Sequence, residues 1–580
     1  MKKKRFLALL MAAAMCLSLA ACSKDEEPPK DDPDQPSDSQ DKDQGKDNVE
    51  PTSGPDADQY FNTYMGAEPS TLDISRRMDA YSSYIMMNTM EGLVRSAAEG
   101  EDLVVTPGEA ESWESNEEGT VWTFHLRDGL KWQDGEPVTA EQYVYSLQRS
   151  ADPNTACPNS FFLEPLLNYP EIAAGTKPVT DLGVKAVDDK TLEITLSAPK
   201  PSFLQMLGST LYYPQRKDIV EKYGEQFGSE AEAYIGNGPF KVESWAHNSS
   251  IVLVKNDNYW NAGEIKLQKI DFAIMTDEST VNNAFESGQI DACTVSTKDF
   301  VDRFQSAGKT YDPYMNNNMA FNFFNLKDPL FANVNIRKAF TLAVDRAAFN
   351  DICYDGMRAP AGGFVVDSMT VGETNYREAA GDMIKEMQDE LKANNQTPKD
   401  LLLQGMKELN LGDDPSTLDV TFSFGSTSNL TKNIGEYVQQ IYKSELGVDV
   451  ELTFNDWGIF NSNVQSGNYQ AGFMSWGAYY NDPYDTLSLF LTGSTAINTG
   501  WANSKFDETI KAAGSQLDEK DRLQGYIDAE TILIKEDCVV SPMATNQVQQ
   551  FYQPYMRGYT NVPYTDTSYM FYYTEGRGAN

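Results

Sequence analysis

Residues 418–454 read LDVTFSFGSTSNLTKNIGEYVQQIYKSELGVDVELTF, and this stretch decides the fold class. Residues 418–424 and 448–454 alternate apolar and polar side chains, which is the pattern of half-buried β-strands. Between them, apolar residues recur at helical spacing and a glycine follows the last of them, as at the end of a helix. A strand, a helix and a strand of these lengths predict a right-handed parallel βαβ unit. The helical set is Ile434, Tyr437, Val438, Ile441 and Tyr442, and the glycine is Gly447.

The residues that follow extend this unit and indicate where a ligand would bind. They predict a further helix from Trp457 to about Gln465 and a strand over 470–476, QAGFMSW. In parallel α/β sheets, ligands bind beyond the carboxyl ends of the strands. The loop after Trp476 is therefore the first place where we expect a binding site.

Three other segments show a clear period and together predict a mixed α/β protein. Residues 190–197, KTLEITLS, alternate like a half-buried strand. Thr139 and Gln142 stand three residues apart before an apolar stripe, which is the pattern of a helix capping box. Residues 333–350, NVNIRKAFTLAVDRAAFN, predict one helix. Its expected inward face is Ile336, Ala339, Phe340, Ala343 and Ala347.

The first 21 residues have the pattern of a bacterial secretory signal peptide. Four cations at positions 2–5 precede an apolar run over 6–21, and small residues end that run. The run is 16 residues long, shorter than the roughly 20 that span a bilayer. The ending LAAC at 19–22 resembles a lipoprotein lipobox, so we expect Cys22 to carry a lipid. The alternatives are an uncleaved anchor helix and an ordinary signal followed by a chance cysteine.

Residues 22–58 are predicted to be the lipidated cysteine and a disordered acidic linker. Residues 23–58 hold 13 Asp or Glu, 4 Lys and 6 Pro, and the aliphatic residues among them are Val49 and Ala57. Such a segment cannot bury enough apolar surface to offset its ordering entropy. We therefore expect an extended tether that holds an extracytoplasmic protein at the cell membrane through the lipid alone. The residues that follow are too many for one core and predict two or three structural units.

The composition excludes several kinds of partner and cofactor. The formal charge of −39 argues against binding nucleic acid and against attraction to an anionic membrane surface. The two histidines, His125 and His247, are isolated, so we expect neither a Ser-His-Asp triad nor a histidine-rich metal site. The cysteines past the linker form no C-x-x-C pair, which argues against zinc, and we expect no cofactor. Buried free thiols are expected, with disulfides as the alternative, at Cys157, Cys293, Cys353 and Cys538.

Several blocks of the sequence resemble the oligopeptide-binding proteins, the extracytoplasmic substrate-binding subunits of ABC peptide importers. Three of these blocks are WTFHLRDGLKWQDGEPVTAEQYVYSLQRSADPNTA at 122–156, GNGPFKVESW at 236–245 and SWGAYYNDPYDTLSLF at 475–490. The resemblance covers roughly residues 59–573. It implies a fold like the type II periplasmic binding proteins, with two hinged α/β lobes and an extra mixed α/β domain in the first lobe. The implied domains are I (59–105, 235–315 and 525–580), II (106–234) and III (316–524).

The resemblance also implies a binding mode and the residues that serve it. In this family the ligand backbone lies extended between the lobes and pairs with short protein strands, which is β-augmentation. By position, those strands are Met78-Asp79-Ala80 and Ser475-Trp476-Gly477. Trp457 and Trp476 match aromatic residues that line side-chain pockets. For each of these two tryptophans, simple packing beside the βαβ sheet is the alternative.

The sequence departs from the family at the residue that anchors the ligand. Peptide receptors of this family commonly show W-x-A-D-Y, in which the Asp binds the ligand's α-ammonium, but residues 476–483 read WGAYYNDP with Tyr479 in that place. Asn159 replaces a second, aromatic contact to the amine. A tyrosine ring offers an ammonium a cation–π contact of about 0.5–2 kcal/mol. We therefore expect either a substitute carboxylate, Asp79, or a ligand that is not held by a free N-terminus. Asp482 is expected to be a turn and cap residue.

Together these features predict a lipid-anchored, monomeric receptor that binds oligopeptides between two lobes and delivers them to ABC permease subunits. No catalytic residue and no metal ligand is expected. A receptor for a non-peptide solute and a sensor of peptides that imports nothing are the alternatives. A secreted hydrolase with paired carboxylates is a more remote one, because no motif singles out such a pair.

Overall fold

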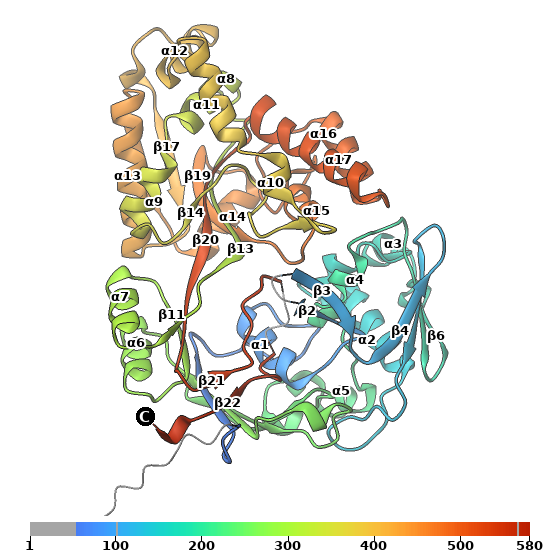
Figure 1. Ribbon diagram of the computed structural model, residues 1–580. Coiled ribbons are helices and arrows are strands. Elements are labelled where there is room, and N and C mark those ends of the chain that lie inside the picture. Colours follow the sequence, from blue (N-terminus) through green and yellow to red (C-terminus); the bar gives the residue numbers. More distant parts are fainter. Residues whose placement is uncertain (1–53, 100–101, 565–567, 580) are drawn as a thin grey trace, which may run out of the picture. The chain divides into compact units, whose positions relative to one another are not determined.

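The structure is a computed structural model that describes residues 54–99, 102–564 and 568–579 (Figure 1). The predicted signal peptide, the lipid site at Cys22 and most of the acidic linker lie outside the described residues. Two large hydrophobic cores account for most of the buried apolar side chains. The first core gathers residues between 61 and 292 together with Tyr480 and residues between 552 and 572. The second core gathers residues between 319 and 544.

Two four-stranded sheets form the frame of the first core. In one, β1 (Tyr60–Met65) runs parallel to β10 (Lys269–Ile274), and β9 (Ser250–Lys255) and β8 (Phe240–Ala246) follow. The strand order in the other is β4 (Ala110–Ser115), β5 (Val121–Leu126), β7 (Thr191–Thr195) and β6 (Val184–Asp188). The prediction of a strand in 190–197 is confirmed by β7. Helix α2 (Ala140–Ala151) begins with the predicted capping box of Thr139 and Gln142.

The predicted βαβ unit is the centre of the second core. Strands β17 (Val420–Phe424) and β18 (Val450–Phe454) pair in parallel, with Phe422 opposite Leu452, and α13 (Asn429–Glu445) connects them. The predicted helix and strand that follow are α14 (Trp457–Ser466) and β19 (Ala471–Gly477), and β19 is parallel to β17. Further helices that bury side chains in this core include α11 (Met383–Ala393), α12 (Pro398–Glu408), α16 (Ser504–Gly514) and α17 (Glu519–Thr531).

The prediction of one continuous helix over 333–350 is wrong. The structure has two helices, α8 (Val334–Leu342) and α9 (Arg346–Tyr354), with Asp345 between them. The Asp345 carboxylate accepts hydrogen bonds from the N–H groups of Ala347 and Ala348 at 3.0 and 3.1 Å. An aspartate that bonds to the backbone in this way starts a helix and does not continue one. As a result, Ala347, which was expected to face inward, is exposed.

Two long strands connect the regions of the two cores. Strand β20 (Val540–Tyr552) pairs with β13 (Tyr314–Phe324) and with the short β14 (Ala359–Pro360), and towards its end it also pairs with β11 (Ala292–Val295). Figure 1 shows β13 and β20 running together. Their register shifts between Met315 and Met319, so the ladder is interrupted there. The positions of the domain boundaries stay a prediction.

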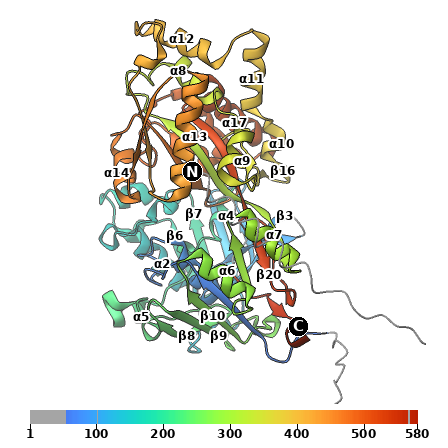
Figure 2. The same ribbon diagram turned by 90° about the vertical axis from the view of Figure 1, so that its left-hand side faces the viewer.

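A third, small core lies beside β11. Helices α6 (Glu278–Glu286) and α7 (Lys298–Ser306) both contact this strand, as Figure 1 shows, and Figure 2 shows the two helices from the side. Its buried residues include Phe285, Phe304 and Phe551. Throughout the described residues the four cysteines are buried and unpaired.

Candidate functional site

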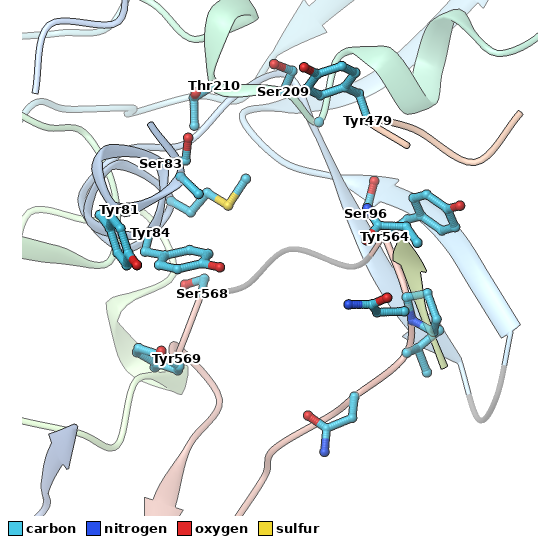
Figure 3. Close-up of a pocket in the computed structure, with 18 of the residues that line it drawn as sticks. Tyr81, Ser83, Tyr84, Ser96, Ser209, Thr210, Tyr479, Tyr564, Ser568 and Tyr569 are labelled. Atoms are coloured by element: carbon cyan, nitrogen blue, oxygen red, sulfur yellow. The ribbon is translucent and has the colours of Figure 1, made fainter. Parts of the chain in front are cut away.

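A cavity of about 970 Å³ is lined by segments that are far apart in the sequence. They include the residues around the start of α1 (Ala80–Thr89), the loop after β19, and residues within 560–564 and 568–572. Figure 3 shows side chains from these segments, with Tyr84, Tyr479, Tyr564 and Tyr569 among them. Eleven tyrosines line the cavity. Because each offers both an apolar ring face and a hydroxyl, the wall suits a neutral, polar chain.

The structure places five of the predicted site residues on the wall of this cavity. They are Met78, Asp79, Ala80, Asn159 and Tyr479. The other four predicted residues, Trp457, Ser475, Trp476 and Gly477, are not part of its lining. Trp457 is 52% exposed on α14, with its ring 5.7 Å from that of Phe460.

The predicted segment 78–80 is not a β-strand in the structure. Ala80 is the first residue of α1, and Asp79 is the N-cap of this helix with extended backbone angles. Met78 is 76% exposed. Its own N–H and C=O have no main-chain hydrogen bond to any described residue. The main chain at Met78 is therefore available to another chain.

The second predicted segment, 475–477, is the last part of strand β19. One edge of these residues pairs with β13, where Trp476 lies opposite Met319. On the other edge, β17 pairs with β19 only as far as Phe473. Beyond Phe473, that edge has no partner strand in the part of the chain that the structure describes. An unpaired edge of this kind is a template for an added strand.

Asp79 uses both carboxylate oxygens to hold its own loop. It accepts hydrogen bonds from the N–H groups of Ser70 and Ser82, at 3.1 and 2.7 Å, and also from both serine hydroxyls. Burial alone would raise the pKa of Asp79, but these hydrogen bonds hold it below its ordinary value. Asp79 is therefore a charged capping residue whose acceptor capacity is largely used.

Tyr479 lies in an aromatic corner of the cavity. Its ring centroid is 4.9 Å from that of Phe162 and 6.3 Å from that of Trp476, both in edge-to-face contact. The Tyr479 side chain is 52% exposed. Its backbone N–H donates to Asp485 Oδ2 at 2.7 Å. The carboxylate of Asp485, which does not line the cavity, therefore binds the main chain of Tyr479.

Asp485 belongs to α15 (Pro483–Leu487), a short helix that lies close to a buried lysine. Burial raises the pKa of Asp485 to about 7, and the charge of Lys200 opposes this effect. The Lys200 ammonium lies 3.5 Å from the ring centroid of Tyr484, and burial lowers its pKa. Asp482 caps α15 through the Tyr484 N–H at 2.8 Å, which confirms its predicted role as a cap.

The sequence did not predict two features of the cavity, Arg77 and the many tyrosines. The loop that holds Arg77 is fixed by Asn159, which donates from Nδ2 to the carbonyl oxygen of Arg77 at 3.0 Å. Arg77 itself lines the cavity next to the predicted segment 78–80. The only local signal was the pair Arg76-Arg77 directly before that segment. The many tyrosines after residue 550 are the other feature, and their spacing follows no period that singles them out.

Groups that could hold a metal are not found among the described residues, where no three His, Cys, Asp or Glu side chains converge. Likewise, none of the helices in the described ranges is both long and apolar enough to cross a bilayer.

The chain was compared with known protein families, sequences and structures. Residues 104–498 match the family described as "Bacterial extracellular solute-binding proteins, family 5 Middle". The dipeptide-binding protein DppE of Bacillus subtilis is 33% identical over 490 residues, which are 83% of this chain and 86% of the relative. The periplasmic oligopeptide-binding protein OppA of Salmonella typhimurium is 33% identical over 516 residues, 87% of this chain and 90% of the relative.

Solved structures agree with these matches. The murein tripeptide-binding protein MppA of Escherichia coli aligns with a TM-score of 0.75 at 27% identity, covering 90% of this chain and 99% of that structure. OppA of Haemophilus influenzae in complex with the peptide RPPGFSPFR aligns with a TM-score of 0.74 at 25% identity, covering 90% and 100%. The predicted fold class, that of the type II periplasmic binding proteins, is confirmed.

Proposed function

Because this chain belongs to the bacterial extracellular solute-binding proteins of family 5, we propose that it is the peptide receptor of an ABC importer. It binds an extended oligopeptide in the cavity next to Tyr479 and delivers it unchanged to permease subunits. The relatives named above are described as binding dipeptides, oligopeptides and murein tripeptides. That shared description supports a peptide as the ligand here.

The observation that carries the proposal is the unpaired main chain of Met78 and of the free edge of β19. The N–H and C=O of an extended peptide can pair with both segments, and such main-chain bonds do not depend on side-chain identity. The cavity volume of about 970 Å³ lies near the top of the roughly 300–1,000 Å³ range of ligand pockets. That size favours a ligand of several residues over a single amino acid.

Strands β13 and β20 supply a means of closing around the peptide. Strand β20 has residues in both cores and pairs with β13, and their ladder is interrupted between Met315 and Met319. A ligand favours a closed state only to the extent that it binds that state better than the open one. A peptide bonded to Met78 on one side and to β19 on the other meets this condition.

We further propose that the receptor is a lipoprotein with no enzymatic activity. Support for the anchor comes from the signal pattern that ends at Cys22 and from the acidic linker after it. The absence of catalysis is supported by the two aspartates that follow β19, because both have structural partners. Asp482 caps a helix, and Asp485 accepts from the Tyr479 N–H. If Cys22 is lipidated, Cys22→Ala should release the protein from membranes, and Cys16→Ala should not. Retention of the Cys22→Ala variant would refute the anchor.

The binding mode is tested by calorimetry of the mature protein with short peptides, followed by mass spectrometry of the recovered ligand. A peptide that binds should be recovered intact. Methylating one main-chain nitrogen that faces a protein strand should weaken binding by about 2–13-fold, the equivalent of one hydrogen bond of 0.5–1.5 kcal/mol. Methylating a nitrogen that faces away is the matched control. If no peptide binds while another solute does, the proposal fails.

A further inference from the structure

Arg77 places an unpaired positive charge in the wall of the cavity. Its Nε donates to the Thr210 hydroxyl at 2.9 Å. Among the described residues this is its only side-chain hydrogen bond, and no Asp or Glu forms an ion pair with it. Burial lowers the pKa of Arg77, while Cys157, Asp79 and Tyr479 act in the opposite direction. A guanidinium keeps its charge even so, because its ordinary pKa is above 12.

The nearby carboxylates cannot neutralise this charge directly. Asp79 is the closest in sequence, but its oxygens are taken by the N–H and hydroxyl groups of Ser70 and Ser82. Asp485 is buried and binds the backbone of Tyr479. Removing a charge from water without a partner costs several kcal/mol, so a partly buried guanidinium favours a ligand that supplies the missing anion.

The cavity wall has more cations than anions, whereas the chain as a whole has a large excess of anions. The charged residues of the lining are Arg77, Arg95 and Asp79, although the chain carries a formal charge of −39. Arg95 is paired with the buried Glu91. Arg77 is therefore the cation whose forked Nη groups are available at this wall. Tyr479 lies near enough for the two groups to influence each other's pKa.

We propose that Arg77 and the hydroxyl of Tyr479 bind a carboxylate of the peptide, at the place where the family resemblance implies a contact to the α-ammonium. This inference rests on the proposed function and deepens it. With Nε held by Thr210, the two Nη groups present the bidentate geometry that matches a carboxylate. The carboxylate has two possible sources, the peptide C-terminus and an acidic side chain. A positively charged amine would be repelled at this position.

Random tetrapeptide pools in four end states test the proposal with the mature, unmodified protein. The pools have free ends, an acetylated N-terminus, an amidated C-terminus, or both ends blocked, and mass spectrometry measures which members the protein retains. Acetylated peptides should be retained within about threefold of free ones. Amidated peptides without Asp or Glu should be depleted at least tenfold, roughly the 1.4 kcal/mol of a charge-assisted hydrogen bond.

The amidated pool distinguishes the two sources of the carboxylate. Retention of amidated members that contain Asp or Glu places the contact on a side chain, and their loss places it on the C-terminus. Retention of neutral amidated peptides together with loss of acetylated ones would overturn the inference and leave the proposed function standing. Failure of every pool to bind would overturn the proposed function itself.

Substitutions at two adjacent arginines provide a second, independent readout. Arg77→Gln should remove most of the preference for acid over amide peptides, and Arg77→Lys should keep part of it. Arg76→Gln is the matched control, because the Arg76 side chain is 46% exposed and lies beside Asp73. Thermal unfolding verifies that each variant is folded. An Arg77→Gln protein that still prefers acids tenfold would overturn the inference, even if its overall affinity fell.

Discussion

The loop before α1 and the loop after β19 both supply aspartates next to the cavity, but the two loops treat them in opposite ways. Asp79 is surrounded by serine donors, and its pKa is held below the ordinary value. Asp485 is buried and accepts from one backbone donor, and burial raises its pKa to about 7. Burial raises the pKa of both carboxyl groups, and the two differ because the four donors of Asp79 outweigh its partial burial, whereas the deeper burial of Asp485 outweighs its one backbone donor.

From this contrast we expect neither aspartate to serve as a counter-ion for a ligand amine. In the loop before α1 the carboxylate is charged but its oxygens already accept four hydrogen bonds, and in the loop after β19 the carboxyl group is buried and keeps its proton up to about pH 7. The free charge between the two loops is the guanidinium of Arg77.

Replacing Asp485 by Asn should have the largest effect, and the effect should depend on pH. The folded protein holds the Asp485 proton up to about pH 7, whereas the unfolded chain releases it near pH 3.8. Unfolding therefore releases a proton between these values, and the stability that Asp485 contributes is lost as pH rises through this window. Asp485→Asn has no such proton and should not show this loss. The free energy of unfolding of the variant minus that of the parent should therefore rise by up to about 4 kcal/mol from pH 4 to pH 7.5, at roughly 1.4 kcal/mol per pKa unit.

Urea unfolding of both proteins across this pH range provides the measurement. Glu109, whose pKa burial raises to about 8, contributes equally to parent and variant, so the difference isolates Asp485. A stability difference that stays constant with pH would show that Asp485 is charged in the folded protein. The contrast between the two loops would then be wrong.

Asp482→Ala should cost about 2–3 kcal/mol, the sum of a lost helix cap and a buried hydroxyl without an acceptor. Asp482 accepts from the Tyr484 N–H at 2.8 Å and from the buried Tyr526 hydroxyl at 2.6 Å. Chemical denaturation at pH 7 measures the loss. Asp482→Asn keeps an oxygen for both donors and should cost less than half as much. Equal costs for the two variants would mean that charge, not hydrogen bonding, holds this loop.

The two loops also differ in how far the sequence predicted them. The βαβ unit that leads to the loop after β19 followed from its apolar periods, and the cap at Asp482 followed from the proline after it. The prediction of one helix over 333–350 failed because its apolar period continues through Asp345, whose side chain starts a new helix. Periodicity records which face is buried, but it does not record a side chain that bonds to the backbone.

The loop before α1 has no period, and its sequence predicted less. The family resemblance placed residues 78–80 at the ligand. The N-cap bond of Asp79 is local, from the Ser82 N–H, but its second oxygen accepts from Ser70, nine residues earlier. The position of Arg77 depends on two contacts from distant parts of the sequence. Its Nε donates to the Thr210 hydroxyl, and its carbonyl oxygen accepts from the Asn159 amide. No local pattern contains these contacts, so this part of the candidate site could be found only from the structure.

Asp79→Ala should destabilise the protein by about 1–1.5 kcal/mol, as expected for the loss of an N-cap. Its effect on peptides with a free amine should be less than twofold, because its oxygens already bind Ser70 and Ser82. Thermal unfolding and calorimetry measure the two quantities, and Asp79→Asn is the control that keeps a capping oxygen. A tenfold loss confined to peptides with a free amine would restore Asp79 as the substitute carboxylate that the sequence suggested.

Tyr479→Asp should have the smallest effect, and it tests the comparison most directly. The substitution adds to the loop after β19 a carboxylate that faces the cavity, where Arg77 has no ion pair in the described protein. A partly exposed pair of this kind is worth about 0–1 kcal/mol, so peptides that present a carboxylate should bind to Tyr479→Asp up to about fivefold more weakly than to Tyr479→Phe. Tyr479→Phe is the matched control, because it loses the same hydroxyl as Tyr479→Asp, keeps the ring against Phe162 and adds no charge. Competition binding with acid and amide forms of one peptide separates the outcomes. If Tyr479→Asp and Tyr479→Phe weaken the acid form equally, the added charge has no partner, and Arg77 does not act at this end of the cavity.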